Sequence, residues 1–352
     1  MDALSGILLL CLAVGVYVVC SLYLLHNPLI LHKRKRLEFY CRHISHRGGK
    51  IWREDRKHDG SFYTVSFCFA LCVCLLFFLV FFTLSVCYCD DDSAVSVGTE
   101  MLEMDCHLTS DGYVVISHDS NLLRQTGYDK TVSSLRFQDL PLYKERLEVT
   151  FYAGHYSTGK DRKFVLLEDV FKNFPNMPMI LEVKENNDLL IRKVSGLVKQ
   201  YHRESITVWA SEESGVMAKC NKQNPSMPYM FTMRRGALLL LLFYTGLLPF
   251  VPLGESLLFF YLPTIINRTY IPEEAILKKR FVVYLLQKLT MRKSLFEHLT
   301  KRGLQVQLFV CNEESDMKAA FDVGATGVMT DYPTVLTNYI NKHPPPPPPP
   351  VY

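Results

Sequence analysis

The chain has 352 residues and a formal net charge of +4; 49% of its residues are hydrophobic and 21% are charged. That length suits one large domain or two small ones, and an α/β barrel with a membrane anchor fits it. The basic residues are scattered and form no stripe of the kind that binds nucleic acid, so we expect no nucleic-acid partner.

The first predicted element is the apolar run from Leu4 to Leu25, which carries no charged residue. It is as long as the ~20 apolar residues that span a bilayer core. A cleaved signal peptide is the alternative, but here the run begins beside Asp2 and the basic cluster Lys33–Arg36 comes after it. We therefore predict an uncleaved anchor over residues 1–32, and the basic cluster favours the cytosolic side for the rest of the chain.

A second uncharged apolar run, Ser61–Cys89, lies where a first barrel helix belongs. A single crossing of the bilayer there would leave His46 and Glu103 on opposite sides of the membrane, and no barrel could close. Three interpretations stay open. The segment forms a buried or surface-lying helix, it forms a tight re-entrant hairpin, or this chain is a variant that folds poorly or is inactive.

A third apolar region, Ala237–Ile266, is interrupted by three prolines, two glycines and Glu255. Such breakers exclude a straight membrane span. The region is either an insertion that dips into the membrane surface or holds an acyl chain, or it consists of buried barrel helices.

From residue 97 to residue 334, short apolar runs alternate with amphipathic stretches. The predicted strands are Met101–Leu108, Tyr113–Ser117, Met179–Val183, Ile206–Ala210, Pro228–Thr232, Val306–Cys311 and Gly327–Thr330. The predicted helices include Leu167–Asn173, Leu189–Tyr201, Arg292–Lys301 and Ser315–Val323. With one strand before His46, the count of strands reaches eight. This alternation predicts an α/β fold, a TIM (β/α)8 barrel over residues 40–340 with the atypical insertion 61–89.

Residues 341–352 form a tail with seven consecutive prolines, Pro344–Pro350. Such a run adopts polyproline II. It is either a ligand for an SH3-type domain or a passive solvated tail.

The 11 cysteines are odd in number, and five of them lie in or beside Ser61–Cys89. No CxxC pair is followed by a second pair at zinc spacing. We expect free, buried thiols rather than a disulfide framework or a metal site.

Charged side chains gather at the predicted strand ends. Glu103 and Asp105 share one face of a strand because strand side chains alternate in direction. Two adjacent carboxylates repel each other unless a cation or a proton lies between them, and oxygen ligands suit Ca²⁺ or Mg²⁺. His46 and His118 each follow a predicted strand, at the end where TIM barrels carry their active sites. Each feature alone has an ordinary structural explanation, and the prediction depends on their occurrence together.

The conjunction resembles a known family. The segments that carry the resemblance are His46-Arg47-Gly48-Gly49, Glu103-Met104-Asp105, Ser117-His118-Asp119, Leu181-Glu182-Val183-Lys184 and Thr330-Asp331-Tyr332-Pro333. In this order they resemble the glycerophosphodiester phosphodiesterase family, in particular its membrane-anchored mammalian branch. The resemblance covers residues from about 1 to 50 and from 97 to 340.

The resemblance implies a TIM barrel with one divalent cation, Ca²⁺ or Mg²⁺, whose ligands are Glu103, Asp105 and Glu182. It implies that the general acid and base are His46 and His118. Phosphate oxygens would be held by Arg47 and Lys184. Trp209 is a candidate substrate-pocket aromatic, and the alternative is that it belongs to the core.

The activity implied is a lysophospholipase D reaction on lysophosphatidylcholine or lysophosphatidylethanolamine. In this family the glycerol 2-hydroxyl is thought to attack first, and water then opens the cyclic phosphate. The products are lysophosphatidic acid and the free head-group alcohol. We expect a membrane location, at the endoplasmic reticulum, with the lipid bilayer as a partner.

The chain departs from the family after Gly49, where a Glu-Asn-Thr triplet usually opens the first barrel helix. Residues 50–97 do not resemble the family. A catalytically impaired membrane protein with a regulatory role, or none, is therefore the alternative to an active enzyme. A multi-span transporter is a third hypothesis, and the barrel motifs argue against it.

Overall fold

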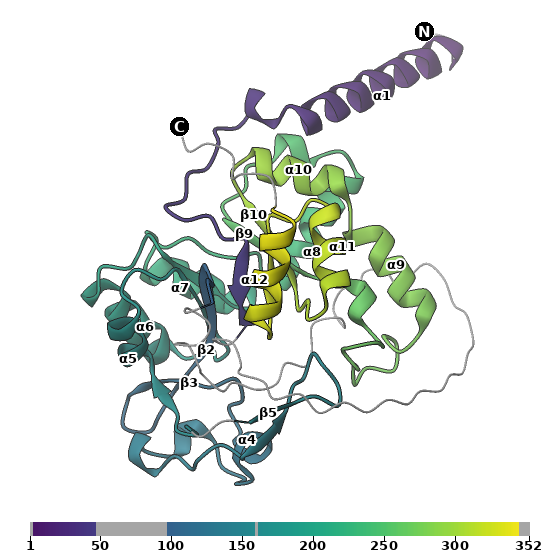
Figure 1. Ribbon diagram of the computed structural model, residues 1–352. Coiled ribbons are helices and arrows are strands. Elements are labelled where there is room, and N and C mark those ends of the chain that lie inside the picture. The colour runs from purple at the N-terminus through teal and green to yellow at the C-terminus, as the bar shows by residue number, and fades with distance from the viewer. Residues whose placement is uncertain (1–2, 47–96, 159–160, 345–352) are drawn as a thin grey trace.

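The computed structural model describes residues 3–46, 97–158 and 161–344. Within these ranges a mainly parallel sheet curls into a barrel surrounded by helices (Figure 1). The parallel strands are β1 His43–Ser45, β2 Met101–Leu108, β7 Met179–Val183, β8 Thr207–Ala210, β9 Leu257–Tyr261, β10 Gln305–Phe309 and β11 Gly327–Thr330. The helices along the barrel are α5 Leu167–Asn173, α6 Asp188–Gln200, α7 Ser214–Gln223, α8 Met233–Tyr244, α9 Arg280–Thr290, α10 Lys293–Lys301, α11 Glu314–Asp322 and α12 Pro333–Lys342.

The barrel closes through eight positions. On one side β1 pairs with β2, β2 with β7 and β7 with β8; on the other β1 pairs with β11, β11 with β10 and β10 with β9. Residues 229–230 join the two arcs, because Tyr229 forms a parallel bridge to Trp209 and Met230 forms one to Leu257. The predicted α/β class is confirmed, and the predicted strand Pro228–Thr232 is reduced to these two bridges.

One predicted strand lies outside the barrel and one barrel strand was missed, so the count of eight is unchanged. Tyr113–Ser117 contains β3 Val114–Ile116, which runs antiparallel to β2 and lies outside the barrel ring. Strand β9 was missed because it lies inside the apolar region Ala237–Ile266, where continuous hydrophobicity hides its alternation. The eighth barrel strand thus lies in a region for which the sequence analysis left open a membrane-surface insertion or buried helices.

The short strand β1 pairs on both sides. His43 to Ser45 are in register with Val328 to Thr330 of β11, and Ile44 and Ser45 are in register with Met101 and Leu102 of β2. The segment Ser61–Cys89 and the departure after Gly49 lie outside the described residues. Their two flanks, β1 and β2, are neighbours in the sheet, which is the condition that barrel closure requires.

Side-chain alternation divides the core into layers. The barrel interior holds one cluster, made of Ile44, Met101, Ile180, Val208, Ala210, Leu257, Phe259 and Met329 together with Phe39 and Cys41. The other faces of the same strands pack against the helices; Leu102, Met104 and Cys106 of β2 belong to that outer layer. Glu103 and Asp105 therefore share one face, as the strand pattern predicted, and that face points into the barrel.

The helices form where their apolar residues recur at helical spacing. Helix α6 begins at Asn187, whose side-chain oxygen accepts hydrogen bonds from the amides of Leu189 and Leu190. It buries Leu190, Ile191, Val194 and Val198 against the sheet. The four predicted helices are all present, within one residue at each end.

An excursion between β2 and β7 crosses the active end of the barrel. It contains β3, α4 Leu123–Thr126, the hairpin of β4 Arg146–Glu148 and β5 Tyr156–Thr158, and β6 Val165–Leu166, with the 3₁₀ turns η3 Val132–Ser134 and η4 Phe137–Asp139. Figure 1 shows these elements in blue at the end of the barrel remote from the N-terminus.

The region Ala237–Ile266 is no membrane span. It holds most of α8, the 3₁₀ turns η5 Leu248–Phe250 and η6 Pro263–Ile265, and the fully buried β9. The alternative of buried barrel helices is wrong for Leu257–Tyr261, which is buried in the barrel but as the strand β9. Helix α8 instead has an exposed apolar face.

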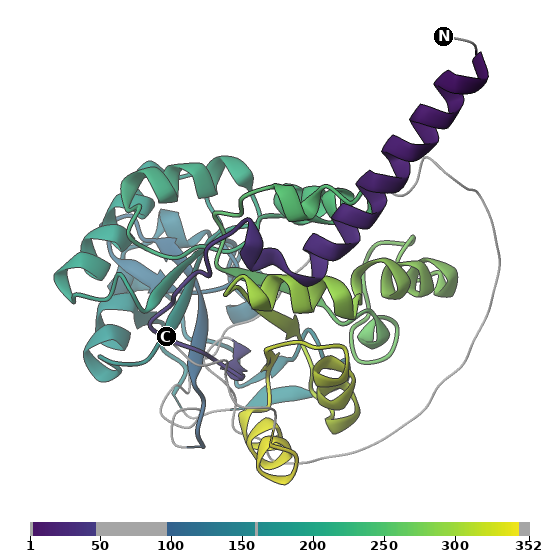
Figure 2. The same ribbon diagram turned by 90° about the horizontal axis from the view of Figure 1, so that it is seen from above.

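Helix α1, Ala3–His26, projects away from the barrel (Figure 2). Among the described residues it is the one helix long and apolar enough to cross a membrane, with a mean hydropathy of 2.6 over Ser5–His26. Only its C-terminal part touches the barrel. The hydroxyls of Tyr17 and Ser21 donate to the carbonyls of Thr245 and Gly246, each at 2.6 Å.

A glycine is required where α1 meets the barrel. Gly246 has a φ of +75°, and a Cβ there would lie 2.7 Å from the Ser21 hydroxyl oxygen. The close contact and the left-handed backbone both exclude a larger residue. Gly246 lies in the loop that leads from α8 into β9, and α1 is thus attached at the amino ends of the strands.

The prediction of free, buried thiols is confirmed for four of the six described cysteines and is wrong on burial for the two on α1. Cys41, Cys106, Cys220 and Cys311 are free and buried, and Cys11 and Cys20 are free on the exposed surface of α1. Of the tail, residues 345–352 lie outside the described ranges.

The contact between α1 and α10 should weaken in acid. The buried Nδ1–H of His298 donates to the Leu25 carbonyl at 2.8 Å, and its Nε2 faces the Arg302 guanidinium at 3.5 Å. Burial lowers the pKa of His298 to about 4 from an ordinary value of 6.5. Its contribution to stability is therefore complete above pH 6.5 and is lost as the pH falls toward 4, by up to about 3 kcal/mol.

Thermal unfolding of the full chain in detergent, followed between pH 7.5 and 4, measures this dependence. His298→Asn keeps a donor for Leu25 but cannot be protonated, so it should flatten the fall in melting temperature. His202→Asn, at an exposed position, should leave the fall unchanged. An unaltered pH dependence in His298→Asn would contradict the assignment.

Candidate active site

Three of the predicted site residues lie at the carboxyl ends of barrel strands. Each of them lies two residues beyond a side chain of the interior core, on the same strand face. His46 follows Ile44, Glu103 follows Met101, and Glu182 follows Ile180. The apolar interior thus forms the floor of the barrel, and the polar side chains stand on it.

Three carboxylates form one cluster. Oxygen atoms of Glu103, Asp105 and Glu182 lie within 4.8 Å of one another. They come together because Asp105 is in register with Glu182 across the β2–β7 pair. Glu103 and Asp105 are buried. Burial raises the pKa of Glu182, and the charge of Asp105 adds to this rise, whereas the charge of Lys184 opposes it.

The donor set fits a hard divalent cation. The ammonium of Lys184 lies 3.1 Å from an Asp105 oxygen and 3.0 Å from a Glu182 oxygen. Clustered buried carboxylates repel one another, and a cation between them offsets that repulsion. Three clustered carboxylates are the oxygen ligands that Ca²⁺ and Mg²⁺ prefer.

His46 lies between the carboxylates and the last barrel strand. Its Nε2 is 4.0 Å from a Glu103 oxygen, and its Nδ1 is 2.8 Å from Oδ1 of Asp331. Phe151, from the β4–β5 hairpin, packs edge-on against the imidazole with ring centroids 5.6 Å apart. The ring is therefore fixed in position on two sides. Arg47, the next residue, lies outside the described ranges.

Asp331 is itself held in place by Asn312. The side-chain amide of Asn312 donates to Oδ2 of Asp331 at 2.9 Å. Its oxygen accepts from the Asp331 backbone amide at 2.9 Å and from the Thr330 hydroxyl at 3.1 Å. Both residues follow barrel strands, β10 and β11, so the sheet itself orients the carboxylate that orients His46.

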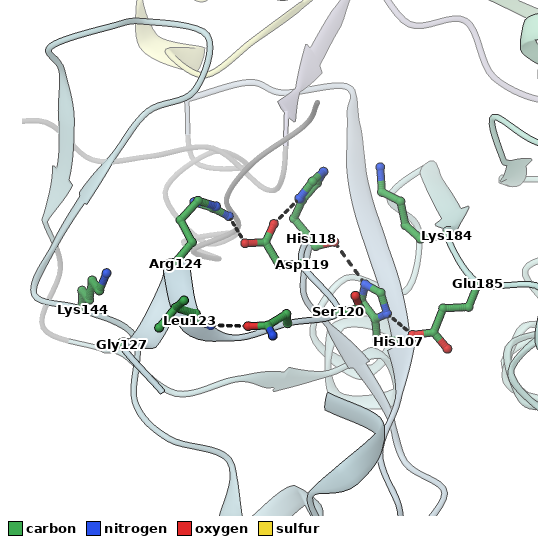
Figure 3. A pocket seen from close by; sticks show the side chains of 11 residues that line it. His107, His118, Asp119, Ser120, Leu123, Arg124, Gly127, Lys144, Lys184 and Glu185 are labelled. Atoms are coloured by element: carbon green, nitrogen blue, oxygen red, sulfur yellow. Dashed lines mark hydrogen bonds and ion pairs between the residues drawn. The ribbon is translucent and has the colours of Figure 1, made fainter. Parts of the chain in front are cut away.

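His118 reaches the site by a different route from the one predicted. Because β3 runs antiparallel to β2, its end returns to the level of the carboxylates, and the Ser117 amide donates to the Asp105 carbonyl at 3.0 Å. Nδ1 of His118 lies 2.7 Å from Oδ1 of Asp119. Oδ2 of Asp119 is 2.5 Å from the Arg124 guanidinium, and Figure 3 shows the three side chains in sequence.

A cleft of about 700 Å³ opens beside His118 and Lys184. That size is typical of small-molecule sites. At its base His107 hydrogen-bonds with Glu185 through Nδ1 and with the His118 carbonyl through Nε2 (Figure 3). The hydrogen bond from His107 lowers the pKa of Glu185. This pair fixes the backbone on which His118 is carried.

Trp209 does not join the site. It is fully buried, and it belongs to the outer core cluster with Leu181 and Met217. Its neighbours Val208 and Ala210 face the barrel interior, so alternation directs Trp209 toward the helices. The placement supports the core alternative over the substrate-pocket prediction.

The sequence analysis gave no role to three residues that lie in or beside the site. Asp331 and Asp119 belong to the motifs that carried the family resemblance, but neither was given a function there. Glu212, after β8, lines the same cavity as His46 and the three carboxylates. Burial, with the charge of Glu182 next, raises the pKa of Glu212 to about 7. The available signal was a carboxylate within three residues of the end of a strand, β11 for Asp331, β8 for Glu212 and β3 for Asp119.

Known proteins resemble this chain over most of its length. It is 44% identical to human lysophospholipase D GDPD3 over 331 residues, covering 94% of this chain and 95% of that protein. It is 43% identical to mouse lysophospholipase D GDPD1 over 328 residues, covering 93% of this chain and 95% of that protein.

Solved structures share the fold. A putative glycerophosphodiester phosphodiesterase from Galdieria sulphuraria superposes with a TM-score of 0.52 at 14% identity, covering 87% of this chain and 100% of that one. One from Agrobacterium tumefaciens superposes with a TM-score of 0.51 at 15% identity, covering 87% and 99%. The profile of the glycerophosphoryl diester phosphodiesterase family matches residues 92–335, and the chain belongs to that family.

Proposed function

We propose that this chain is a metal-dependent lysophospholipase D, which hydrolyses lysophospholipids to lysophosphatidic acid and the free head-group alcohol. The observation that carries the proposal is the cluster of Glu103, Asp105 and Glu182 flanked by two histidines, each hydrogen-bonded to an aspartate. The relatives named lysophospholipase D give the substrate class. Lysophosphatidylcholine and lysophosphatidylethanolamine are the expected substrates.

The proposed cation ligands are the three clustered carboxylates. A divalent cation there supplies charge that draws electron density from the phosphate oxygens. Ca²⁺ and Mg²⁺ both suit an all-oxygen donor set. Arg47 and Lys184 are the proposed phosphate-binding residues; the ammonium of Lys184 already lies in the cluster, where a phosphate oxygen can reach it.

The two histidines are the proposed proton carriers. Each presents Nδ1 to an aspartate oxygen, which fixes the tautomer with Nδ1–H donating to the carboxylate. Nε2 is then the atom that exchanges a proton with substrate. One histidine removes a proton from the attacking hydroxyl, and the other protonates the oxygen of the leaving alcohol.

We propose that α1 anchors the chain in a membrane, expected to be that of the endoplasmic reticulum. Its length and mean hydropathy of 2.6 support this, and so does the exposure of its side chains from Ile7 to Cys20. The proposed domains are the anchor over residues 1–32, the barrel over 40–340 and the tail over 341–352.

A catalytically impaired chain is the alternative, favoured by the missing Glu-Asn-Thr triplet. The geometry supports the active enzyme more strongly. β1 lies in register between its two neighbours, and His46 is within 4.0 Å of Glu103. The part of the site that the structure describes is assembled without the triplet.

Head-group release by the purified full chain tests the proposal. Choline should be released from lysophosphatidylcholine, EDTA should stop the release, and Ca²⁺ or Mg²⁺ should restore it. Glu103→Ala and Glu182→Gln should each lower turnover at least about 100-fold, since a catalytic cation supplies several kcal/mol.

The matched control is Glu213→Gln, an exposed carboxylate near the site, which should retain activity. Turnover that survives EDTA or Glu103→Ala would overturn the metal-dependent mechanism. A correctly folded chain without any turnover would instead favour the impaired alternative.

Asp331 should matter through His46 rather than by touching substrate. Asp331→Asn should lower turnover by about 10²- to 10⁴-fold, the range of general acid–base catalysis, because an amide cannot stabilise the imidazolium. The pH–rate profile should change shape while the melting temperature changes little. Asp139→Asn, on the exposed surface, is the control. An unchanged pH profile in Asp331→Asn would assign Asp331 a structural role only.

A further inference from the structure

One wall of the barrel carries an exposed apolar surface. We call it the α8 face, and it consists of Leu238, Leu241, Tyr244, Leu247 and Phe250. Leu241 is 59% exposed and Tyr244 is 48% exposed. The first three residues recur at a spacing of three on α8, while Gly236, Leu239 and Leu240 on its other side are buried. A surface helix of a soluble barrel is ordinarily polar on its outer side.

The neighbouring helix α9 extends the α8 face. The Tyr244 hydroxyl donates to the Leu289 carbonyl at 2.9 Å, which places the C-terminal ends of α8 and α9 together. On α9, Phe281 is 53% exposed and Tyr284 is 57% exposed. The Lys288 ammonium lies over the Tyr284 ring, 5.5 Å from its centroid. The outer helix α6 on the opposite arc presents a single exposed leucine, Leu189.

The α8 face is continuous with α1. The Tyr17 ring of α1 stacks on Phe250, with centroids 6.4 Å apart. After α1, the turn η1 Pro28–Ile30 adds the exposed side chains Leu29, Ile30 and Leu31, and His32 hydrogen-bonds with the Pro249 carbonyl at 2.8 Å. Figures 1 and 2 both show α1 leaving the barrel beside α10. One apolar surface therefore runs from the helix onto the barrel.

Tyrosines and basic residues border this surface. Tyr17, Tyr23, Tyr244 and Tyr284 are exposed along it. Lys33 and Arg36 are exposed in the segment after η1, and the Lys301 ammonium donates to the His26 carbonyl at the end of α1. Tyrosine favours the boundary between acyl chains and head groups, and lysine and arginine pair with lipid phosphates. This composition fits a lipid surface better than a protein partner.

We propose that the α8 face rests in the surface of the bilayer that holds α1, so that the barrel is docked on the membrane rather than tethered above it. The proposal rests on the proposed anchoring by α1. The docked part is the rim at the amino ends of the strands, because α1 contacts the loop that leads into β9 and the helix α10 that precedes β10. The catalytic groups lie at the other end of the barrel.

Tryptophan fluorescence of the full chain in phosphatidylcholine vesicles tests the docking. Leu241→Trp reports on the α8 face, Leu12→Trp reports on α1, and Leu189→Trp is the matched control on another outer helix. The unsubstituted chain, with Trp52 and Trp209, gives the baseline. When the acyl chains are brominated, Leu12→Trp and Leu241→Trp should both lose fluorescence, and Leu189→Trp should not.

The three variants separate the two proposals. Quenching of Leu12→Trp without quenching of Leu241→Trp would overturn the docking and leave the anchor intact. In that case the α8 face lies in water or against a second copy of the chain. Quenching of neither would overturn both proposals. Substitutions at exposed leucines should not impair folding, and an unchanged circular dichroism spectrum checks this.

Discussion

The structure depends on three residues of β1 filling the gap between β11 and β2. That pairing closes the barrel, and it also assembles the site, because His46 follows β1 directly and comes to lie between Glu103 and Asp331. A strand this short contributes few hydrogen bonds of its own. It is held by its two neighbours and by Ile44, which is fully buried in the interior cluster. Closure of the barrel and formation of the site are thus one event.

The candidate site contains two histidine–aspartate pairs. Each histidine is backed by an aspartate, and each aspartate is held by a further residue, Asn312 for Asp331 and Arg124 for Asp119. The two arms differ in origin. One comes from the last two strands of the barrel, and the other comes from the excursion after β2. The pair of His118 and Asp119 is therefore supplied by an inserted segment and not by the repeating βα units.

Sequence periodicity was sufficient for the elements that alternate clearly. Strand β2 was predicted to the residue, and the shared face of Glu103 and Asp105 followed from it. Periodicity was insufficient for β9, where the hydrophobic residues are continuous and do not alternate. It was also insufficient for β3, because a strand pattern does not show whether the strand runs parallel or antiparallel to the strand beside it. Trp209 shows the same limit. Alternation along β8 places Trp209 on one face of the strand, but the sequence does not say which face packs against the helices. The pairing of β8 with β7 settles this.

The anchor and the catalytic groups lie at opposite ends of one barrel. With α1 in a bilayer, a lipid in that bilayer must leave it and pass through water to reach His46 and His118. Each methylene that leaves the bilayer costs about 0.8 kcal/mol, so a single acyl chain is held only marginally, whereas two chains are held far more firmly. With the proposed anchoring by α1, this orientation favours substrates with one acyl chain, which desorb from the bilayer more readily than substrates with two.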